Sequence, residues 1–314
     1  MPLDRRLRAL LWIGERLGGD LPVARITPTL ARREFTATMR KLRLLAIGRP
    51  PRLAEVRDLT IPVDDAAIPA RLYRPRGVTT PPIVVYFHGG GWVIGSVNDY
   101  DPFVRRLAAE LGAIVVAVDY RCAPERPHPT AAEDCYQATR WIAGEAAALG
   151  GAPGRLAVAG DSAGGNLSAV VSILARERGG PTIGAQVLYY PVVDDDLDRP
   201  SYLENARGLG LTRERMGWYW GCYAPPGVDR RAPSLAPLHA DLRGLPPALV
   251  ITAEYDVLRD EGDDYAAALR AAGVAVEHDR VAGVIHGYAL MLRLLPQARA
   301  TMRRVRGFLE RALG

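Results

Sequence analysis

The chain has 314 residues, a net charge of +5 and a hydrophobic content of 48%. This length and composition allow one large α/β domain with insertions or two ordinary domains, and they exclude wholesale disorder. The basic residues are scattered among 35 acidic ones, without a dense Lys/Arg block that has interleaved aromatics, so we expect no nucleic-acid partner.

Cysteine usage and apolar runs bear on the compartment. Cys122, Cys135 and Cys222 cannot all pair and show no C-x-x-C spacing, so we expect neither a disulfide framework nor a zinc site. The apolar stretch 9–13 is too short for a signal peptide. No run approaches the roughly 20 apolar residues of a membrane span. We therefore expect a cytoplasmic protein without stable membrane insertion.

The N-terminal part of the chain changes character near residue 50. Residues 1–50 contain leucines at helical spacing and are predicted to be helical. Pro50 and Pro51 end this region. Strand patterns then follow on both sides of the polar turn Asp64-Asp65, which predicts an antiparallel hairpin.

Beyond residue 81, apolar runs of strand length alternate with helical patterns. The predicted strands are 83–87, 113–120, 155–160, 184–190, 248–254 and 274–281. The predicted helices are 101–111, 130–149, one that begins at 162, 262–272 and a final one at the C-terminus. This alternation predicts an α/β fold with a mostly parallel sheet covered on both faces.

Residues 191–246 break the alternation. They are rich in Pro, Gly, Trp and Tyr and contain one clear helical pattern at 212–223. A detour of roughly fifty residues is too long for a simple connection. We expect it to fold over the carboxyl edge of the sheet as a cap together with 1–50, and the alternative is a surface excursion without a role at the site. The two parts of the core would then be 51–190 and 247–314.

A serine motif lies between a predicted strand and a predicted helix. Gly160 to Gly164 fit Gly-x-Ser-x-Gly, with Ser162 at its centre. The glycines are required where strand and helix approach closely, and the strained serine backbone exposes the hydroxyl beside a helix N-terminus. Ser162 is the predicted nucleophile, and the alternative is an ordinary helix-capping serine.

A triple-glycine loop, His-Gly-Gly-Gly-Trp, starts at His88 directly after the predicted strand 83–87. Three consecutive glycines are conformationally costly, so they indicate backbone N–H groups that face a ligand closely. A phosphate loop is the competing interpretation, but no Gly-Lys-Ser/Thr follows and the Rossmann spacing is absent. We predict an oxyanion hole formed by the N–H groups of Gly90, Gly91 and Ala163. His88 and Gly89 would support the loop.

Among five histidines, His286 lies in a glycine-bounded loop after the last predicted strand and is the predicted general base. Asp256 follows the preceding strand and is the predicted acid that orients it. Glu254 and Asp260 are competitors, but we assign Glu254 to the strand and Asp260 to the helix. The order Ser162, Asp256, His286 is the one that α/β-hydrolases show.

Together these motifs resemble the hormone-sensitive-lipase family of bacterial esterases with an HGGG motif. The matching segments are 88–92, 119–125, 160–167, 255–260 and 283–288, which span about two thirds of the chain. The resemblance implies an α/β-hydrolase fold with an eight-stranded sheet and a helical cap, and no metal or cofactor. It also implies carboxylic ester substrates with short to medium acyl chains, and a homodimer is compatible with it.

The sequence therefore predicts a serine carboxylesterase that acts on small-molecule esters through an acyl-enzyme intermediate. Five apolar or aromatic residues either line the substrate pocket or belong to the core: Trp92, Tyr190, Val257, Leu258 and Tyr288. Two rivals remain. One is an amidase or peptidase, and the other is a non-catalytic receptor on the same fold, although such receptors usually lose the histidine.

Overall fold

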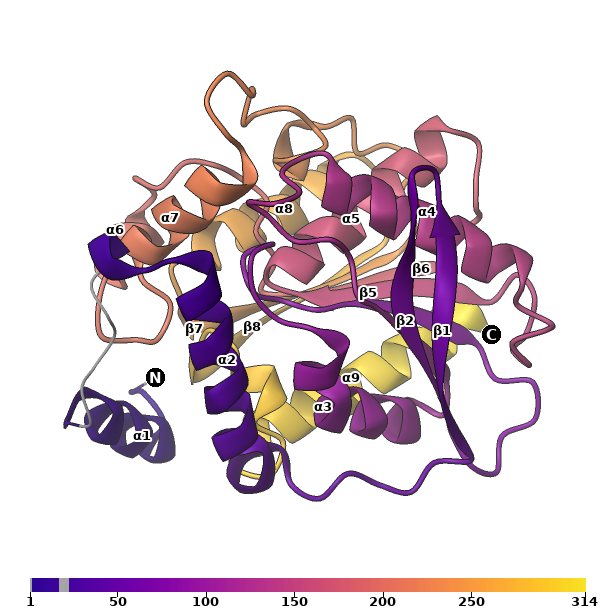
Figure 1. Ribbon diagram of the computed structural model, residues 1–314, viewed down its shortest axis with the longest axis horizontal. Helices are drawn as coiled ribbons and strands as arrows, with labels where there is room; N and C mark the ends of the chain where they lie inside the picture. Colours follow the sequence, from indigo (N-terminus) through magenta and orange to yellow (C-terminus); the bar gives the residue numbers. More distant parts are fainter. Residues whose placement is uncertain (1, 17–22) are drawn as a thin grey trace.

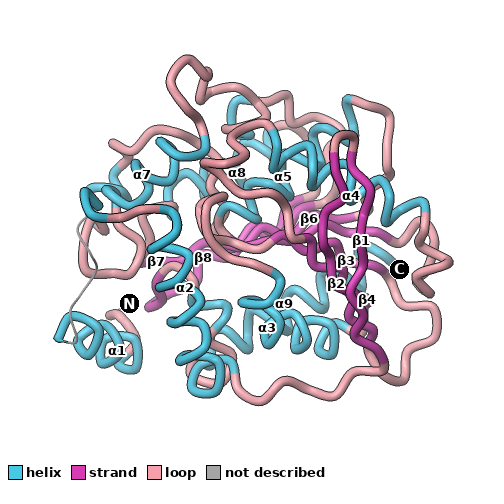
Figure 2. The backbone as a smooth tube through the Cα atoms, viewed as in Figure 1, coloured by secondary structure: helices cyan, strands magenta, loops and turns pink. Residues whose placement is uncertain are grey.

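An eight-stranded sheet forms the centre of the molecule, and helices cover both of its faces (Figures 1 and 2). The computed structural model describes residues 2–16 and 23–314. The strand order is β1-β2-β4-β3-β5-β6-β7-β8. The pairs β1/β2 and β2/β4 are antiparallel, and the others are parallel. The predicted α/β class with a mostly parallel sheet is confirmed.

Strands and helices alternate from β3 to the C-terminus. The strands are β1 Glu55–Val63, β2 Ala66–Arg74, β3 Ile83–Phe87, β4 Ile114–Val118, β5 Leu156–Asp161, β6 Ala185–Tyr189, β7 Ala248–Tyr255 and β8 Val276–Ile285. The helices are α1 Arg5–Arg16, α2 Pro28–Leu42, α3 Val97–Leu111, α4 Thr130–Gly144, α5 Ala163–Glu177, α6 Pro200–Glu204, α7 Arg213–Tyr223, α8 Arg259–Ala271 and α9 Pro296–Leu313. Four short helical turns complete the order: η1 Val23–Arg25, η2 Arg43–Ile47, η3 Pro237–His239 and η4 Tyr288–Leu290.

The central strands β3 to β6 are buried along their whole length. Successive side chains of a strand point to opposite faces. In β3, Val84 and Tyr86 pack in the apolar cluster that includes α3 and α9, whereas Val85 and Phe87 pack with α4 and α5. In Figure 1, α3 and α9 lie below the sheet, and α4, α5 and α8 lie above it. Because both faces are covered, these strands are apolar except for Asp161 at the end of β5 and Gln186 in β6.

Local capping explains where α3 begins. The helix starts at Val97 rather than at the predicted 101, because Ser96 Oγ accepts a hydrogen bond of 3.2 Å from the Asp99 N–H. It ends at Gly112, whose φ of 62° is the left-handed conformation that glycine adopts easily. α4 ends earlier and α8 begins earlier than predicted.

The carboxyl ends of β7 and β8 lie side by side, since the two strands are parallel neighbours. β8 continues to Ile285, beyond residue 281 where the prediction ended it. Asp256 follows the last residue of β7, and His286 follows the last residue of β8. The sheet therefore delivers both side chains to the same edge.

The segment 191–247 leaves the sheet after β6 and returns at β7. It contains α6, α7 and η3, and α7 packs against η1 of the N-terminal region (Figure 1). Trp220 and Tyr223 of α7 are fully buried in the same apolar cluster as β3 and α5. The segment is thus packed onto the core, and its division from the core as a cap stays a prediction.

Two structural features bear on assembly and location. β1 and β8 are the outer strands of the sheet, and a homodimer through one of them stays a prediction. Over residues 2–16 and 23–314, no helix has both the length and the apolar character that crossing a membrane requires.

A core substitution in β7 tests how strongly this sheet is held. Leu249 is fully buried, so Leu249→Ala should lower the free energy of unfolding by about 2–5 kcal/mol through lost burial and a residual cavity. Leu203→Ala, at a residue that is 58% exposed, should change it by less than about 0.5 kcal/mol. Chemical denaturation followed by tryptophan fluorescence measures both, and equal effects would contradict the described core.

Candidate active site

Ser162 occupies a sharp turn between β5 and α5, with φ of 58° and ψ of −118°. Its N–H donates to the carbonyl of Tyr189 at 2.9 Å. A Cβ at Gly160 would lie 2.2 Å from the Gly164 carbonyl oxygen, and one at Gly164 would lie 2.0 Å from that of Phe87. Only glycine fits at either position, and this crowding holds the serine in a conformation that costs of order 1–3 kcal/mol.

His286 connects Ser162 to a buried carboxylate. Its Nε2 lies 3.0 Å from Ser162 Oγ, and its Nδ1 lies 2.7 Å from Asp256 Oδ2. Asp256 is buried, and its other oxygen accepts from the Leu258 N–H at 3.1 Å. With Nδ1–H donating to the carboxylate, Nε2 is left to accept the serine proton. The arrangement holds the imidazole in the tautomer that a general base needs.

The two competing carboxylates have other partners. Glu254, in β7, accepts from the Gly283 N–H at 2.7 Å. Asp260, in α8, accepts from the Ser201 N–H at 2.7 Å and from Arg259 Nε at 2.8 Å. These contacts direct both side chains away from the imidazole and favour Asp256 as its partner.

The loop that carries Asp256 is held by α6 and the residue after it. Ser201 Oγ donates to the carbonyl of Val257 at 2.6 Å, and Asn205 Nδ2 donates to the carbonyl of Asp256 at 3.2 Å. Both donors are buried. Sequence reasoning missed them, because no local pattern links residue 201 or 205 to a strand end more than fifty residues later; the pairing arises only when segment 191–247 folds back.

The glycine loop lies against the serine elbow, since a Cβ at Gly89 would lie 2.9 Å from the Asp161 carbonyl oxygen. Gly90 has φ of 121° and Gly91 has φ of 58°. A Cβ at Gly90 would lie 2.1 Å from the Ile94 carbonyl oxygen, and one at Gly91 would lie 2.2 Å from the ring of Tyr219. In the described part of the chain, the N–H groups of Gly90, Gly91 and Ala163 donate to no protein acceptor. These donors are available to a ligand oxygen.

Asp161, next to the serine, ties the glycine loop to the elbow. Its Oδ1 accepts from the Gly89 N–H at 2.9 Å and from the Tyr86 hydroxyl at 2.5 Å, and its Oδ2 accepts from the Tyr100 hydroxyl at 3.0 Å. Burial raises the pKa of the Asp161 carboxyl, although the two tyrosine hydrogen bonds act to lower it. Sequence reasoning gives Asp161 no role, although an acidic residue at the end of an otherwise apolar strand is a signal that could have found it.

His88 is buried within the same loop. Its ring stacks on Tyr120 with centroids 4.3 Å apart, and its Nδ1 lies 2.8 Å from the Gly89 carbonyl oxygen. The Tyr120 hydroxyl donates to the His88 carbonyl at 2.8 Å. These contacts give His88 a structural place in the loop rather than a place beside the serine.

The five pocket candidates all lie in the core. None exposes more than 1% of its surface: Trp92, Tyr190, Val257, Leu258 and Tyr288. Trp92 stacks on Tyr223 at 4.4 Å between centroids, and the Tyr288 hydroxyl hydrogen-bonds to Thr301 at 2.8 Å. Tyr190 lies nearest the reactive groups, with its ring 4.7 Å from that of His286. Burial therefore favours the core alternative for this set.

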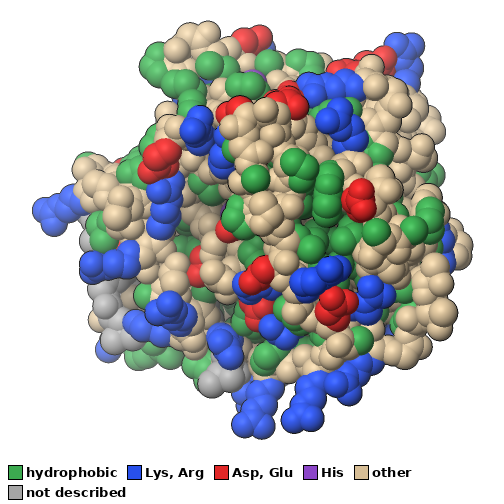
Figure 3. Space-filling view, turned by 45° about the vertical axis from the view of Figure 1, so that its right-hand side comes forward, with side chains coloured by type: hydrophobic (Ala, Val, Ile, Leu, Met, Phe, Trp, Pro, Cys, Tyr) green, Lys and Arg blue, Asp and Glu red, His purple; other side chains and the backbone are tan. Residues whose placement is uncertain are grey.

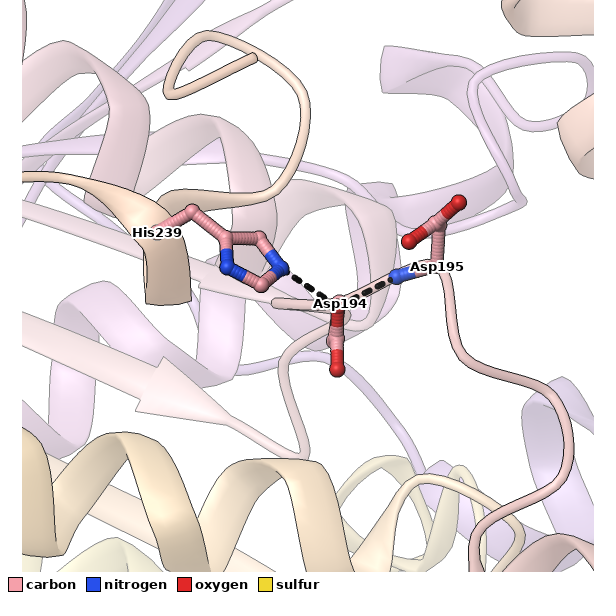
Figure 4. Close-up of side chains that lie close together, drawn as sticks. All are labelled: Asp194, Asp195 and His239. Carbon is pink, nitrogen blue, oxygen red and sulfur yellow. Dashed lines mark hydrogen bonds and ion pairs between the residues drawn. The ribbon is translucent and has the colours of Figure 1, made fainter. Parts of the chain in front are cut away.

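One group of side chains has the composition of a metal site. Ligand-type atoms of Asp194, Asp195 and His239 lie within 4.8 Å of one another (Figure 4). Asp194 is already bonded by Arg199 at 2.5 Å and by His239 at 2.8 Å. Burial acts to raise the pKa of Asp194, but the hydrogen bonds from Arg199 and His239 outweigh it and lower the pKa. A guanidinium on the central carboxylate repels a cation, so we interpret the group as an ion-pair network.

The pH dependence of stability tests the Asp161 network. Because burial raises the pKa of Asp161, the free energy of unfolding should fall as the pH rises from the ordinary carboxyl pKa through the raised one. Tyr86→Phe removes a donor that stabilises the carboxylate, so it should cost about 2 kcal/mol near pH 7. Its cost should be smaller near pH 4, where more of the carboxyl is protonated.

Tyr265→Phe is the matched control for that measurement. Tyr265 is also fully buried, but its hydroxyl has no hydrogen-bond partner among the described residues. Removing it should be nearly neutral at both pH values, as determined by urea denaturation. A Tyr265→Phe effect as large as that of Tyr86→Phe would show that the Asp161 contact is not what stabilises the loop.

Comparisons with known proteins agree with this architecture. Residues 84–290 match a family described as the alpha/beta hydrolase fold. Carboxylesterase NlhH of Mycobacterium tuberculosis is 44% identical over 283 residues, which cover 87% of this chain and 88% of the relative. Ethyl acetate hydrolase of Pseudomonas putida is 35% identical over 95% of both chains. A hyperthermophilic esterase from Pyrobaculum calidifontis superposes with a TM-score of 0.93 at 40% identity, with full coverage of both chains.

These matches confirm the predicted family and enzyme class. The glycine loop, the serine elbow and the Asp256 and His286 loops all fall within residues 84–290. The chain therefore belongs to the alpha/beta hydrolase fold family and, within it, to the hormone-sensitive-lipase-like esterases that its motifs resemble, and it is an ester hydrolase.

Proposed function

We propose that the chain hydrolyses carboxylic esters by acyl transfer to Ser162, with His286 as general base and Asp256 as the residue that orients it. The observation that carries this proposal is the continuous hydrogen-bonded series from Asp256 Oδ2 through His286 to Ser162 Oγ, with separations of 2.7 and 3.0 Å. Such a series activates a serine hydroxyl, which is otherwise a weak nucleophile.

In the first step, Ser162 Oγ attacks the ester carbonyl carbon while His286 Nε2 takes the hydroxyl proton. The carbonyl oxygen becomes an oxyanion facing the N–H groups of Gly90, Gly91 and Ala163. Each preorganised donor of this kind is worth about 2.7–4 kcal/mol at the transition state. The imidazolium then gives its proton to the departing alkoxide, which leaves as an alcohol.

In the second step, water replaces the alcohol. His286 takes a proton from the water, which attacks the acyl carbon and regenerates the oxyanion in the same donor cradle. Collapse releases the carboxylic acid, and the proton returns from His286 to Ser162 Oγ. Asp256 stays ionised throughout and stabilises the imidazolium.

The surroundings of the serine support short- to medium-chain acyl groups. Ser162 is only 7% exposed, and the ring of Tyr219 from α7 lies against Gly91 of the glycine loop. Segment 191–247 thus contributes a wall at the oxyanion loop and, through Ser201 and Asn205, a support for the acid loop. This is the role of a cap. A relative named ethyl acetate hydrolase agrees with a small substrate.

Replacement of the nucleophile is the primary test. Wild-type protein mixed with p-nitrophenyl butyrate should release p-nitrophenol in a burst stoichiometric with enzyme when deacylation is slower than acylation. Ser162→Ala should abolish the burst and lower kcat by about 10⁴-fold or more. Full activity in the Ala variant would overturn the proposal.

The assignment of the acid has its own comparison. Asp256→Asn should lower kcat by about 10⁴-fold, because the amide favours the wrong imidazole tautomer. Glu254→Gln, two residues away, keeps an oxygen that accepts from the Gly283 N–H and should retain activity within a few-fold. The opposite ranking would transfer the role to Glu254.

Acyl preference is measured with a series of p-nitrophenyl esters. We expect kcat/KM to be highest for chains of about two to eight carbons and to fall at least about tenfold for hexadecanoate, because a longer chain must displace buried side chains. Tyr219→Ala should shift the optimum toward longer chains by opening the wall beside Gly91. An optimum that stays at the same length would remove Tyr219 from the acyl site.

A further inference from the structure

A cavity of about 910 Å³ lies between residues 47–49, α3 and α9. None of the proposed catalytic residues lines it. Six arginines do: Arg49, Arg106, Arg293, Arg299, Arg303 and Arg306. Figure 3 shows Lys and Arg side chains gathered along the lower edge of the molecule, the edge at which α3 and α9 lie in Figure 1.

The charge of this cavity is strongly unbalanced. Its six guanidinium groups face one lining carboxylate, that of Glu110, a surplus as large as the net charge of +5 of the entire chain. Outside the lining, Glu310 pairs with Arg306 at 2.8 Å. Elsewhere a single arginine can have two carboxylate partners, as Arg121 does with Asp65 and Asp134, each at 2.7 Å. Among the lining residues, guanidinium groups therefore outnumber carboxylates six to one, and Glu110 lies 3.8 Å from Arg106.

The arginines are arranged by regular structure. Arg299, Arg303 and Arg306 recur at the spacing of one helical face on α9. From α3, Arg106 donates to the carbonyl of Arg49 at 2.9 Å, while its buried Nε has no hydrogen-bond partner among the described residues. A buried, unpartnered guanidinium N–H is costly unless a ligand satisfies it.

Residues 47–49 close the cavity on the side that α3 and α9 leave open. The Arg293 N–H donates to the carbonyl of Ala46 at 2.7 Å, which joins η2 to the turn that precedes α9. Gly48, with φ of 91°, comes so close to Arg106 that a Cβ would lie 3.4 Å from its guanidinium. The segment 47–49 is thus fitted against the arginines.

The floor of the cavity is apolar. Ile47, Leu292 and Met302 line it and belong to the core cluster beneath the sheet. A ligand that uses the whole space therefore combines an anionic group with an apolar chain, since hydrophobic surface favours apolar contact and the guanidinium groups favour an oxyanion.

We propose that this cavity binds an amphiphilic phosphate: a phosphate headgroup held by the arginines, with an alkyl chain on the apolar floor. Guanidinium groups bind phosphate oxygens in pairs of parallel hydrogen bonds. The surplus of positive charge matches a doubly charged phosphate better than a carboxylate with a single charge. The site is separate from Ser162 and does not depend on the proposed acyl transfer.

Binding is measured by isothermal titration with octyl phosphate, inorganic phosphate and octanoate. Octyl phosphate should bind at least about tenfold more tightly than either of the others, because only it satisfies both parts of the cavity. Vesicles of phosphatidic acid and of phosphatidylcholine distinguish a membrane headgroup from a free amphiphile as the source. Binding of soluble octyl phosphate is required in either case.

Two neighbouring arginines of α9 provide a matched pair of variants. Arg303→Gln should weaken octyl phosphate binding by about tenfold, as expected for loss of one charge-assisted contact. Arg304→Gln alters an exposed arginine that instead faces Asp279 at 3.3 Å, outside the cavity, and should leave binding unchanged. Hydrolysis of p-nitrophenyl butyrate should be unchanged in both variants, which shows that they are folded.

Several results would overturn the proposal. These are no binding of octyl phosphate, equal binding of octanoate, equal effects of the two variants, or binding only to vesicles. Octyl phosphate that merely competes with the ester at Ser162, with no change in Arg303→Gln, would also overturn it. If the wild type hydrolysed no ester, the catalytic proposal would be wrong and the phosphate-binding proposal would be unaffected.

Discussion

The close approach of β3, β5 and α5 at the serine elbow is the constraint on which the site depends. The Phe87 carbonyl stands where a side chain on residue 164 would have to be, and the Gly164 carbonyl blocks one on residue 160. Since β3 and β5 are parallel neighbours, the glycine loop that follows β3 is pressed against the elbow that follows β5. Asp161 joins the two through the Gly89 N–H. Ser162 and the glycine loop, the proposed nucleophile and oxyanion hole, are therefore parts of one packed unit, and neither can shift without the other.

Asp256 and His286, the proposed acid and base, follow β7 and β8 at one end of the strand order. Their placement depends on a different part of the chain. β7 and β8 bring Asp256 and His286 to one edge, but the strand ends alone leave the loop after β7 unsupported. Ser201 and Asn205 bind its carbonyls from α6 and the residue that follows it. In the proposed mechanism, segment 191–247 thus forms a wall of the substrate site and also supports the loop that carries Asp256. Movement of segment 191–247 would change substrate access and imidazole orientation together, because α7 carries Tyr219 against Gly91 and α6 carries Ser201 against the loop after β7.

Sequence patterns predict features that depend on local constraints, such as the serine elbow. They do not predict contacts between distant segments, such as those of Ser201 and Asn205 with the loop after β7. The strand order could not be read from the sequence, but Gly160 and Gly164 identify the elbow, because a strand-to-helix turn demands glycine wherever it occurs. The early start of α3 follows from a serine cap that the apolar pattern does not register. The sequence does not show whether Trp92, Tyr190 and Tyr288 line the pocket or belong to the core, since an aromatic residue near a catalytic motif has the same sequence pattern in either place. All three are buried in the structure, which favours the core alternative.

The arginines of this chain have two different structural roles. Most of those within the fold are structural ties: Arg32 bonds the Val93 and Ala123 carbonyls beside the glycine loop, and Arg199 bridges Asp194 and Asp264. The charges of these two groups are balanced by carboxylates, since Arg32 also pairs with Glu125 at 2.5 Å. The arginines between α3 and α9 are different, since they stand close together with one lining carboxylate among them. Like charges that line one cavity repel one another, so their clustering carries a free-energy cost unless an anion lies among them. An anion there would lie below the sheet, away from the edge that carries Ser162 and His286, so the two proposed sites can serve separate ligands.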